Sequence, residues 1–139
     1  MAKLQSPIKE KFENLVNKSN EQFENGKHND SIITLEEAWD LLPEPKGVYS
    51  EDSFYLVKDI IDTCFILKDY KKAKEWSNKI YITGLARKDT GKKEFISGKV
   101  AFELGEVELA KEFFNIANKK SEGRCFEGED TKYLRCFKS

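Results

Sequence analysis

Few residues of this chain combine the types and spacing that catalysis or metal binding requires. The sequence holds three cysteines, Cys64, Cys125 and Cys136, and a single histidine, His28. No Cys-x2-Cys pair is present, so no structural metal site is expected. A nucleophilic cysteine such as Cys125 needs a histidine base beside it. We expect His28 to lie in a solvent-exposed turn at the opposite end of the molecule, which argues against such a pair.

Two further patterns resemble catalytic motifs only in part. Residues Asp89 to Lys93 read DTGKK. This stretch lacks the G-x4-G-K-[ST] spacing of a phosphate-binding loop and the strand that precedes one, and we interpret it as a basic turn. Asp59 and Asp62 lie one helical turn apart, and most such pairs form a solvated helix face. The sequence therefore predicts no catalytic residue, no metal and no cofactor, and we expect that the protein is not an enzyme.

The composition is typical of one soluble domain. The chain has 139 residues, of which 35% are charged and 12% are aromatic, enough for a hydrophobic core. No apolar run approaches the about 20 residues that cross a membrane. The first residues lack the apolar segment of a signal peptide. An odd number of cysteines fits free thiols, so we expect a cytoplasmic protein.

Charge is distributed in blocks along the chain. Residues 1–67 carry 7 basic and 13 acidic side chains, whereas residues 68–93 carry 9 basic and 3 acidic ones. Residues 94–139 are nearly balanced. Clustered lysines can bind nucleic acid, but the acidic first block argues against a long polyanion. A bipolar protein suits a protein partner better, because complementary patches guide association. The basic block has a second explanation, since its helix could simply neighbour the acidic helix before it.

Apolar residues recur at helical spacing throughout, interrupted by short turn-forming stretches. We expect helix hairpins at about residues 7–42, 50–86 and 91–120, and a cap at about 121–139. The helix that Ser50 opens is apolar on nearly all sides and is expected to be central. Residues 1–6 are expected to form a loose arm. Asp130-Thr131 is expected to cap a final helix.

One spacing pattern recurs between hairpins. Gly98, Gly105, Ala110, Phe114 and Ala117 are separated by steps of 7, 5, 4 and 3, and Ser19, Gly26, Ser31, Leu35 and Ala38 repeat these steps. A weaker middle copy consists of Ile61, Lys68, Ala73, Ser77 and Ile80. Small residues let two helix backbones approach, and a glycine between them ends the first helix. The pattern predicts an all-α stack of similar helix pairs.

This pattern resembles the tetratricopeptide repeat, with its glycine-bounded first helix, A-x3-F motif and later proline. The resemblance covers roughly residues 12 to 120. It implies a right-handed α-solenoid of about three helix-turn-helix hairpins with a C-terminal capping helix. In such arrays the first helix of each pair lines a groove that receives a partner. The matching residues here are Asn20, Phe23, Glu24, Lys58, Asp62, Phe65, Phe95, Lys99 and Phe102. We add Arg124, because arginine anchors are enriched at protein interfaces.

A narrower resemblance rests on WDLLPEPK, GKVAFELG and the closing KKSEGRCFEGED-x2-Y. These segments look like those of small bacterial tetratricopeptide-like proteins encoded beside polymorphic toxins. Such proteins are presumed to be immunity proteins that bind and neutralise the cognate toxin domain. The resemblance implies that function here, with a toxin encoded by a neighbouring gene as partner. The alternative is a general peptide-binding adaptor or co-chaperone. No membrane partner is expected, and nucleic acid is the weakest of the three alternatives.

Overall fold

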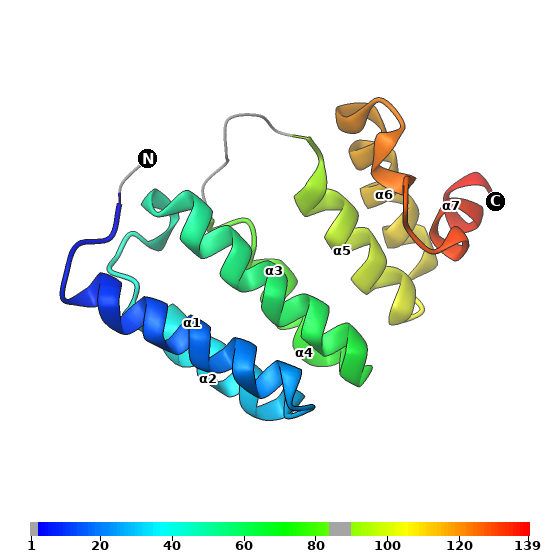
Figure 1. The fold of residues 1–139 in the computed structure, drawn as a ribbon. Helices are drawn as coiled ribbons and strands as arrows, with labels where there is room; N and C mark the ends of the chain where they lie inside the picture. Colours follow the sequence, from blue (N-terminus) through cyan, green and yellow to red (C-terminus); the bar gives the residue numbers. More distant parts are fainter. Residues whose placement is uncertain (1–2, 84–89) are drawn as a thin grey trace.

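The computed structural model describes residues 3–83 and 90–139, which form only helices, turns and irregular segments (Figure 1). The prediction of an all-α fold is confirmed for these residues. The α-helices are α1 (Ile8–Glu24), α2 (His28–Leu41), α3 (Ser50–Leu67), α4 (Tyr70–Lys79), α5 (Lys92–Glu103), α6 (Val107–Ser121) and α7 (Thr131–Lys138). Two one-turn 3-10 helices, η1 (Lys46–Val48) and η2 (Arg124–Phe126), lie in the connections before α3 and α7.

The helices pack in consecutive pairs, α1 with α2, α3 with α4, and α5 with α6. Contacts of α2 with α3 and of α4 with α5 join each pair to the next, so the pairs follow one another along the molecule (Figure 1). Both η2 and α7 pack against α6 at the C-terminal end. Neighbours in sequence are therefore neighbours in space.

Corresponding positions of the three spacing copies are buried in the second helix of each pair. They are Ser31, Leu35 and Ala38 of α2, Ala73 and Ser77 of α4 with Ile80 just beyond it, and Ala110, Phe114 and Ala117 of α6. In the first copy Ser19 and Ser31 meet, with their hydroxyl oxygens 2.8 Å apart in a buried hydrogen bond. The small residues thus lie where the paired helices approach each other.

The larger of two hydrophobic clusters extends from α1 to α5, and α3 supplies Leu56, Val57, Ile60, Ile61 and Cys64 to it. Trp39 of α2 and Trp76 of α4 meet edge to face, with ring centroids 5.6 Å apart. Edge-to-face contact is a favoured geometry for aromatic pairs. Both α2 and α4 also pack on α3, in keeping with its expected central position.

The smaller cluster joins α5, α6, η2 and α7 around four aromatic rings, those of Phe95, Phe114, Phe126 and Tyr133. The ring of Phe114 is completely buried and lies directly over Gly98. Asp130 caps α7 by accepting a hydrogen bond from the backbone N–H of Lys132. The C-terminal segment is thus ordered by its aromatic side chains.

Several local predictions were wrong. Leu4 is buried in the larger cluster, so residues 3–6 are not the loose arm that was expected, and residues 1 and 2 lie outside the described residues. His28 is the first residue of α2, not a turn residue, and its Nδ1 atom is buried without a hydrogen-bond partner. The second hairpin was expected to extend to about residue 86, but α4 ends at Lys79, and residues 84–86 lie outside the described residues.

Candidate functional site

A cleft of about 670 Å³ opens between α3, the start of α5 and the segment that follows α6. Phe95 and Ile96, both almost fully buried, form part of its apolar wall, and charged side chains surround them. The lining residues that carry charge are Lys58, Asp62, Lys92, Lys99, Lys120, Arg124, Glu127 and Glu129. Five cations against three carboxylates give this cleft, which we call the basic cleft, a positive balance.

The structure brings half of the sequence-predicted site residues together in the basic cleft, namely Lys58, Asp62, Phe95, Lys99 and Arg124. Phe65 lies close by, since the Nζ atom of Lys99 is 5.8 Å from its ring centroid. Phe95 is almost fully buried, so its ring contributes a supporting wall and little accessible surface.

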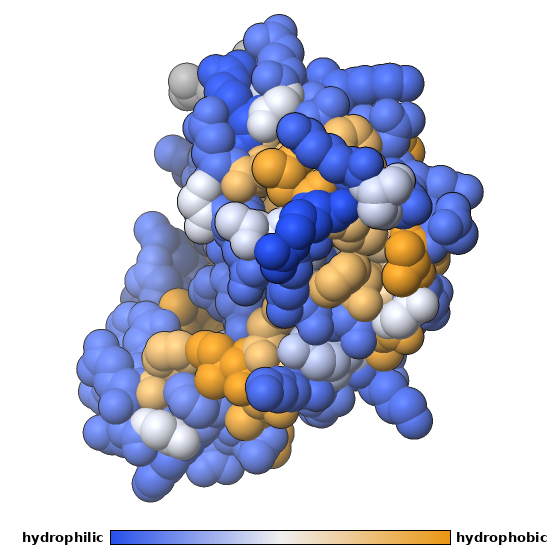
Figure 2. Space-filling view, turned by 90° about the vertical axis from the view of Figure 1, so that its right-hand side faces the viewer, coloured by the Kyte–Doolittle hydropathy of each residue, from blue (hydrophilic) through white to orange (hydrophobic). Residues whose placement is uncertain are grey.

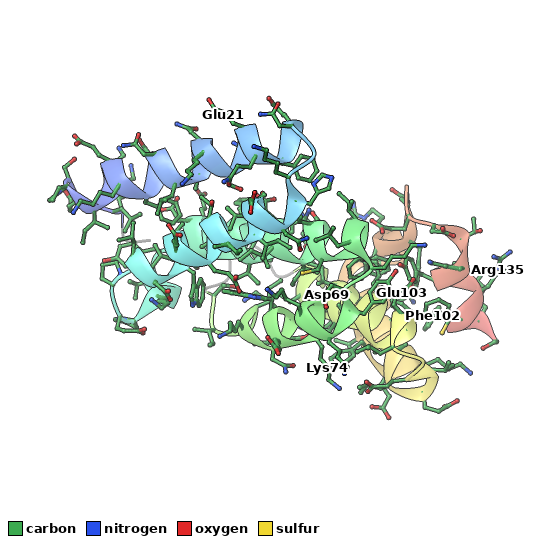
Figure 3. All side chains as sticks on the ribbon, turned by 90° about the horizontal axis from the view of Figure 1, so that it is seen from below. Glu21, Asp69, Lys74, Phe102, Glu103 and Arg135 are labelled. Atoms are coloured by element: carbon green, nitrogen blue, oxygen red, sulfur yellow. The ribbon has the colours of Figure 1, made fainter. Side chains whose placement is uncertain are left out.

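The other predicted residues lie elsewhere. Asn20, Phe23 and Glu24 are exposed near the end of α1, where Phe23 packs edge to face against His28. Phe102 is half-buried beside α7, with its ring centroid 5.5 Å from that of Tyr133. Figure 3 shows it next to Glu103, at the end of α5 that faces α7.

Every sequence-predicted cation in the basic cleft is held by a carboxylate of this chain. The Nζ atom of Lys58 lies 2.8 Å from Oδ2 of Asp62, one helical turn along α3. The Nζ atom of Lys99 lies 3.2 Å from Oε1 of Glu129. The Nη2 atom of Arg124 lies 3.7 Å from Oε2 of Glu122. The pairs at Lys58 and Arg124 are well exposed, and exposed pairs are worth only about 0–1 kcal/mol. Such pairs can exchange partners at little cost.

Lys99 is the most constrained of these cations. Its side chain is only 18% exposed, and its Nζ atom lies 5.3 Å from the ring centroid of Phe95 as well as near Phe65. Aromatic faces attract cations. The ammonium group is therefore fixed at one position between α3, α5 and the segment before α7.

The pKa of Lys58 reflects two opposed influences. Burial lowers it, but the hydrogen bond and the negative charge of Asp62 outweigh burial, so the pKa is raised above its ordinary value. The charge of Glu129 acts in the same direction. Lys58 therefore stays positively charged, and Glu129 is close enough to influence both lysines.

The surface between α1 and α3 has the opposite character. Two adjoining depressions of about 490 and 220 Å³ share Phe12, Val16, Glu51 and Asp52. Burial, followed by the charges of Glu51 and Glu13, raises the pKa of Asp52. Partial burial and the charge of Asp62 raise the pKa of Asp59, although its side chain still reaches solvent. Carboxylates are thus crowded here, and the surface along α3 changes from acidic to basic.

Sequence reasoning missed several cleft residues, namely Lys92 at the start of α5, Lys120 and Ser121 at the end of α6, and Glu127 and Glu129 after η2. Glu127 and Glu129 join the cleft because the chain after α6 turns back toward α3, through Glu122 with a φ of 55° and Gly123 with a φ of 84°. The glycines on both sides of η2 are the signal for this turn in the sequence. The helix periodicity does not show where the turn leads.

Figure 2 views the molecule from the side on which α7 lies in Figure 1, and it shows hydrophobic residues in separate patches divided by hydrophilic ones. Within residues 3–83 and 90–139 no group of three or more His, Cys, Asp or Glu side chains is arranged to hold a metal ion. The helices described are all too short or too polar to cross a bilayer.

No protein-family model and no curated protein matches this chain.

Proposed function

We propose that this protein is a non-enzymatic binding module, a right-handed α-solenoid of three tetratricopeptide-like hairpins with a C-terminal cap. The burial of corresponding residues in α2, α4 and α6 supports equivalence of the three pairs. The consecutive packing of the pairs supports a solenoid, because each repeat in such an array contacts its neighbours. The smaller aromatic cluster supports a capping role for α7, since a terminal repeat must cover its apolar face.

The work of this module is to bind a cognate bacterial toxin domain in the cytoplasm and to block it. The observation that carries this proposal is the basic cleft, where charged side chains with exchangeable partners surround apolar surface. Interfaces of this kind gain specificity and association rate from complementary charge. The segments WDLLPEPK, GKVAFELG and KKSEGRCFEGED supply the resemblance to immunity proteins.

The test is rescue of growth in cells that express the toxin domain encoded beside this gene, with direct binding measured by calorimetry. Lys99→Glu reverses a charge in the cleft and should weaken binding by more than tenfold, because truncating one side of a buried interfacial pair costs about 2–5 kcal/mol. Arg124→Ala tests a second cation of the cleft, and Phe102→Ala tests the predicted aromatic residue that lies outside the cleft beside α7. Lys71→Glu is the matched control, since Lys71 is exposed on α4 and is not part of the cleft.

Lack of rescue and of binding by the wild-type protein would rule out the immunity function. A second candidate is a peptide-binding adaptor or co-chaperone, which the size of the cleft and its partly apolar wall favour. Binding of short segments from unrelated proteins, without binding of the neighbouring toxin, would support this candidate.

A further inference from the structure

We infer that the basic cleft receives aspartate or glutamate side chains from an acidic segment on the surface of the protein partner. This inference rests on the proposed binding function and specifies the chemistry of what is bound. It assigns direct contacts with the incoming carboxylates to Lys58, Lys92 and Lys99.

The chain itself shows how a carboxylate fits this cleft. Glu129 arrives from the segment after η2 and places its Oε1 atom 3.2 Å from Nζ of Lys99. Lys99 is held at the same time over the rings of Phe95 and Phe65. Glu129 lies 30 residues from Lys99 in sequence, so this contact is a long-range one that the fold has to bring about. The fold therefore already forms a binding position for a carboxylate group at Lys99.

The cations that line the cleft outnumber the carboxylates that line it. Lys92 is exposed and has no ion-pair partner among the described residues. Lys58 and Asp62 keep 36% and 48% of their side-chain surface exposed, so the outer side of this pair remains open. An incoming carboxylate can approach Lys92 directly and reach Lys58 without first displacing Asp62.

A protein segment fits this cleft better than a nucleic acid does. Asp62, Glu127 and Glu129 lie among the cations and would repel the closely spaced phosphates of a polyanion. Beyond Lys58, α3 presents Asp59, Asp52 and Glu51, which close that direction to a long negatively charged chain. Isolated carboxylates on a protein surface can match the cations individually.

The experiment measures binding of a fluorescein-labelled hexaglutamate peptide, capped at both ends so that only side-chain carboxylates are present. Anisotropy at low salt is compared for the wild type, Lys99→Gln, Glu129→Gln and the control Lys71→Gln. Lys99→Gln should weaken binding about tenfold, the effect of losing one charge-assisted contact. Glu129→Gln should strengthen binding about threefold, because the competing carboxylate is removed. Lys71→Gln should change nothing.

The opposite responses of Lys99→Gln and Glu129→Gln separate a local site from general attraction to a basic surface. Circular dichroism and the melting temperature show that each variant is folded. Three results overturn the inference: no peptide binding by the wild type, weaker binding by Glu129→Gln, or equal binding of oligothymidylate. A fourth result comes from an NMR titration of the wild type with the hexaglutamate peptide. The inference is also overturned if the amide chemical shifts that change belong to residues outside the cleft, or to an interface between two copies of the chain.

The toxin assay distinguishes this inference from the proposed function. If the toxin binds the wild type and Lys99→Gln equally well, the function stands and the assigned contact is wrong. If no toxin binds but hexaglutamate occupies the cleft with the expected variant responses, the carboxylate site stands and the immunity function fails.

Discussion

Phe114 covers Gly98 so closely that a Cβ atom at Gly98 would lie 2.6 Å from Cδ1 and Cε1 of the ring. The ring cannot move aside easily, because Phe95, Phe126 and Tyr133 surround it. In the interior of a helix, alanine is normally more stable than glycine by about 1 kcal/mol. Here we expect Gly98→Ala to lower the free energy of unfolding by about 1–2 kcal/mol, since overpacking outweighs that gain. Urea denaturation measures the change.

The control for Gly98→Ala is the same substitution in a Phe114→Leu background. A smaller side chain relieves the contact, so Gly98→Ala should cost less there than in the wild type. Equal costs in both backgrounds would mean that Phe114 is not the group that the new methyl group meets.

Ala110 offers an independent check on the contact between α5 and α6. Its side chain is completely buried within the smaller cluster. Ala110→Leu should therefore overpack the helix pair and lower the free energy of unfolding by about 1–3 kcal/mol. Thermal unfolding followed by circular dichroism measures it. A melting temperature equal to that of the wild type would show that α6 presents another face to α5.

The crowded carboxylates on α3 predict a dependence of stability on pH. Because the pKa of Asp59 is raised in the folded protein, ionisation opposes folding, and this cost develops as the pH rises through the folded-state pKa. Below the ordinary value of 3.8 the carboxyl group is protonated in both states and the cost is absent. Asp59→Asn should thus raise the melting temperature slightly at pH 7 and not at pH 3, and the gain is small because solvent screens the exposed Asp59 side chain.

Melting temperatures at the two pH values measure this effect. Glu37→Gln is the control, because Glu37 is exposed on α2 and lines neither acidic depression. A gain for Asp59→Asn that persists at pH 3 would assign the effect to helix propensity and not to ionisation.

The three cysteines should react with iodoacetamide in a fixed order. All are free thiols, with Cys64 and Cys136 buried and Cys125 half-buried. Burial raises the pKa of the Cys64 thiol to about 12, so very little reactive thiolate forms at pH 8. Peptide mass spectrometry should find Cys125 labelled first, and Cys64 only after denaturation. Early labelling of Cys64 in the native protein would show that α3 opens locally.

The helices themselves could be predicted from sequence because they follow local rules. Periodic apolar residues marked the segments, and the repeated steps of 7, 5, 4 and 3 marked positions that prove to be buried in α2, α4 and α6. The cap at Asp130 was also recognisable, because an Asp before a helix accepts a backbone hydrogen bond.

The rest depended on long-range packing, which periodicity does not contain. Leu4 is buried because the start of the chain packs on the larger cluster. The basic cleft forms because η2 and Glu129 return toward α3 and α5, and the contact of Glu129 with Lys99 spans 30 residues. The prediction named Lys58 and Lys99 from their places on the first helices, and Arg124 as an interface anchor, but it did not place Glu129 beside Lys99.

The division of the core into two clusters gives α5 a special place in the folding of this chain. Ile96 and Val100 belong to the larger cluster, whereas Phe95 and Ala101 belong to the smaller one. Each cluster therefore loses one of its walls when α5 unravels. Because α5 belongs to both clusters, the stability of the N-terminal part depends on that of the C-terminal part, unlike in a chain of independent helix pairs. The unfolding of the less stable cluster should therefore set the rate at which the backbone amides of α5 exchange with deuterium. The exchange rates of these amides thus report on the cooperativity of the whole molecule.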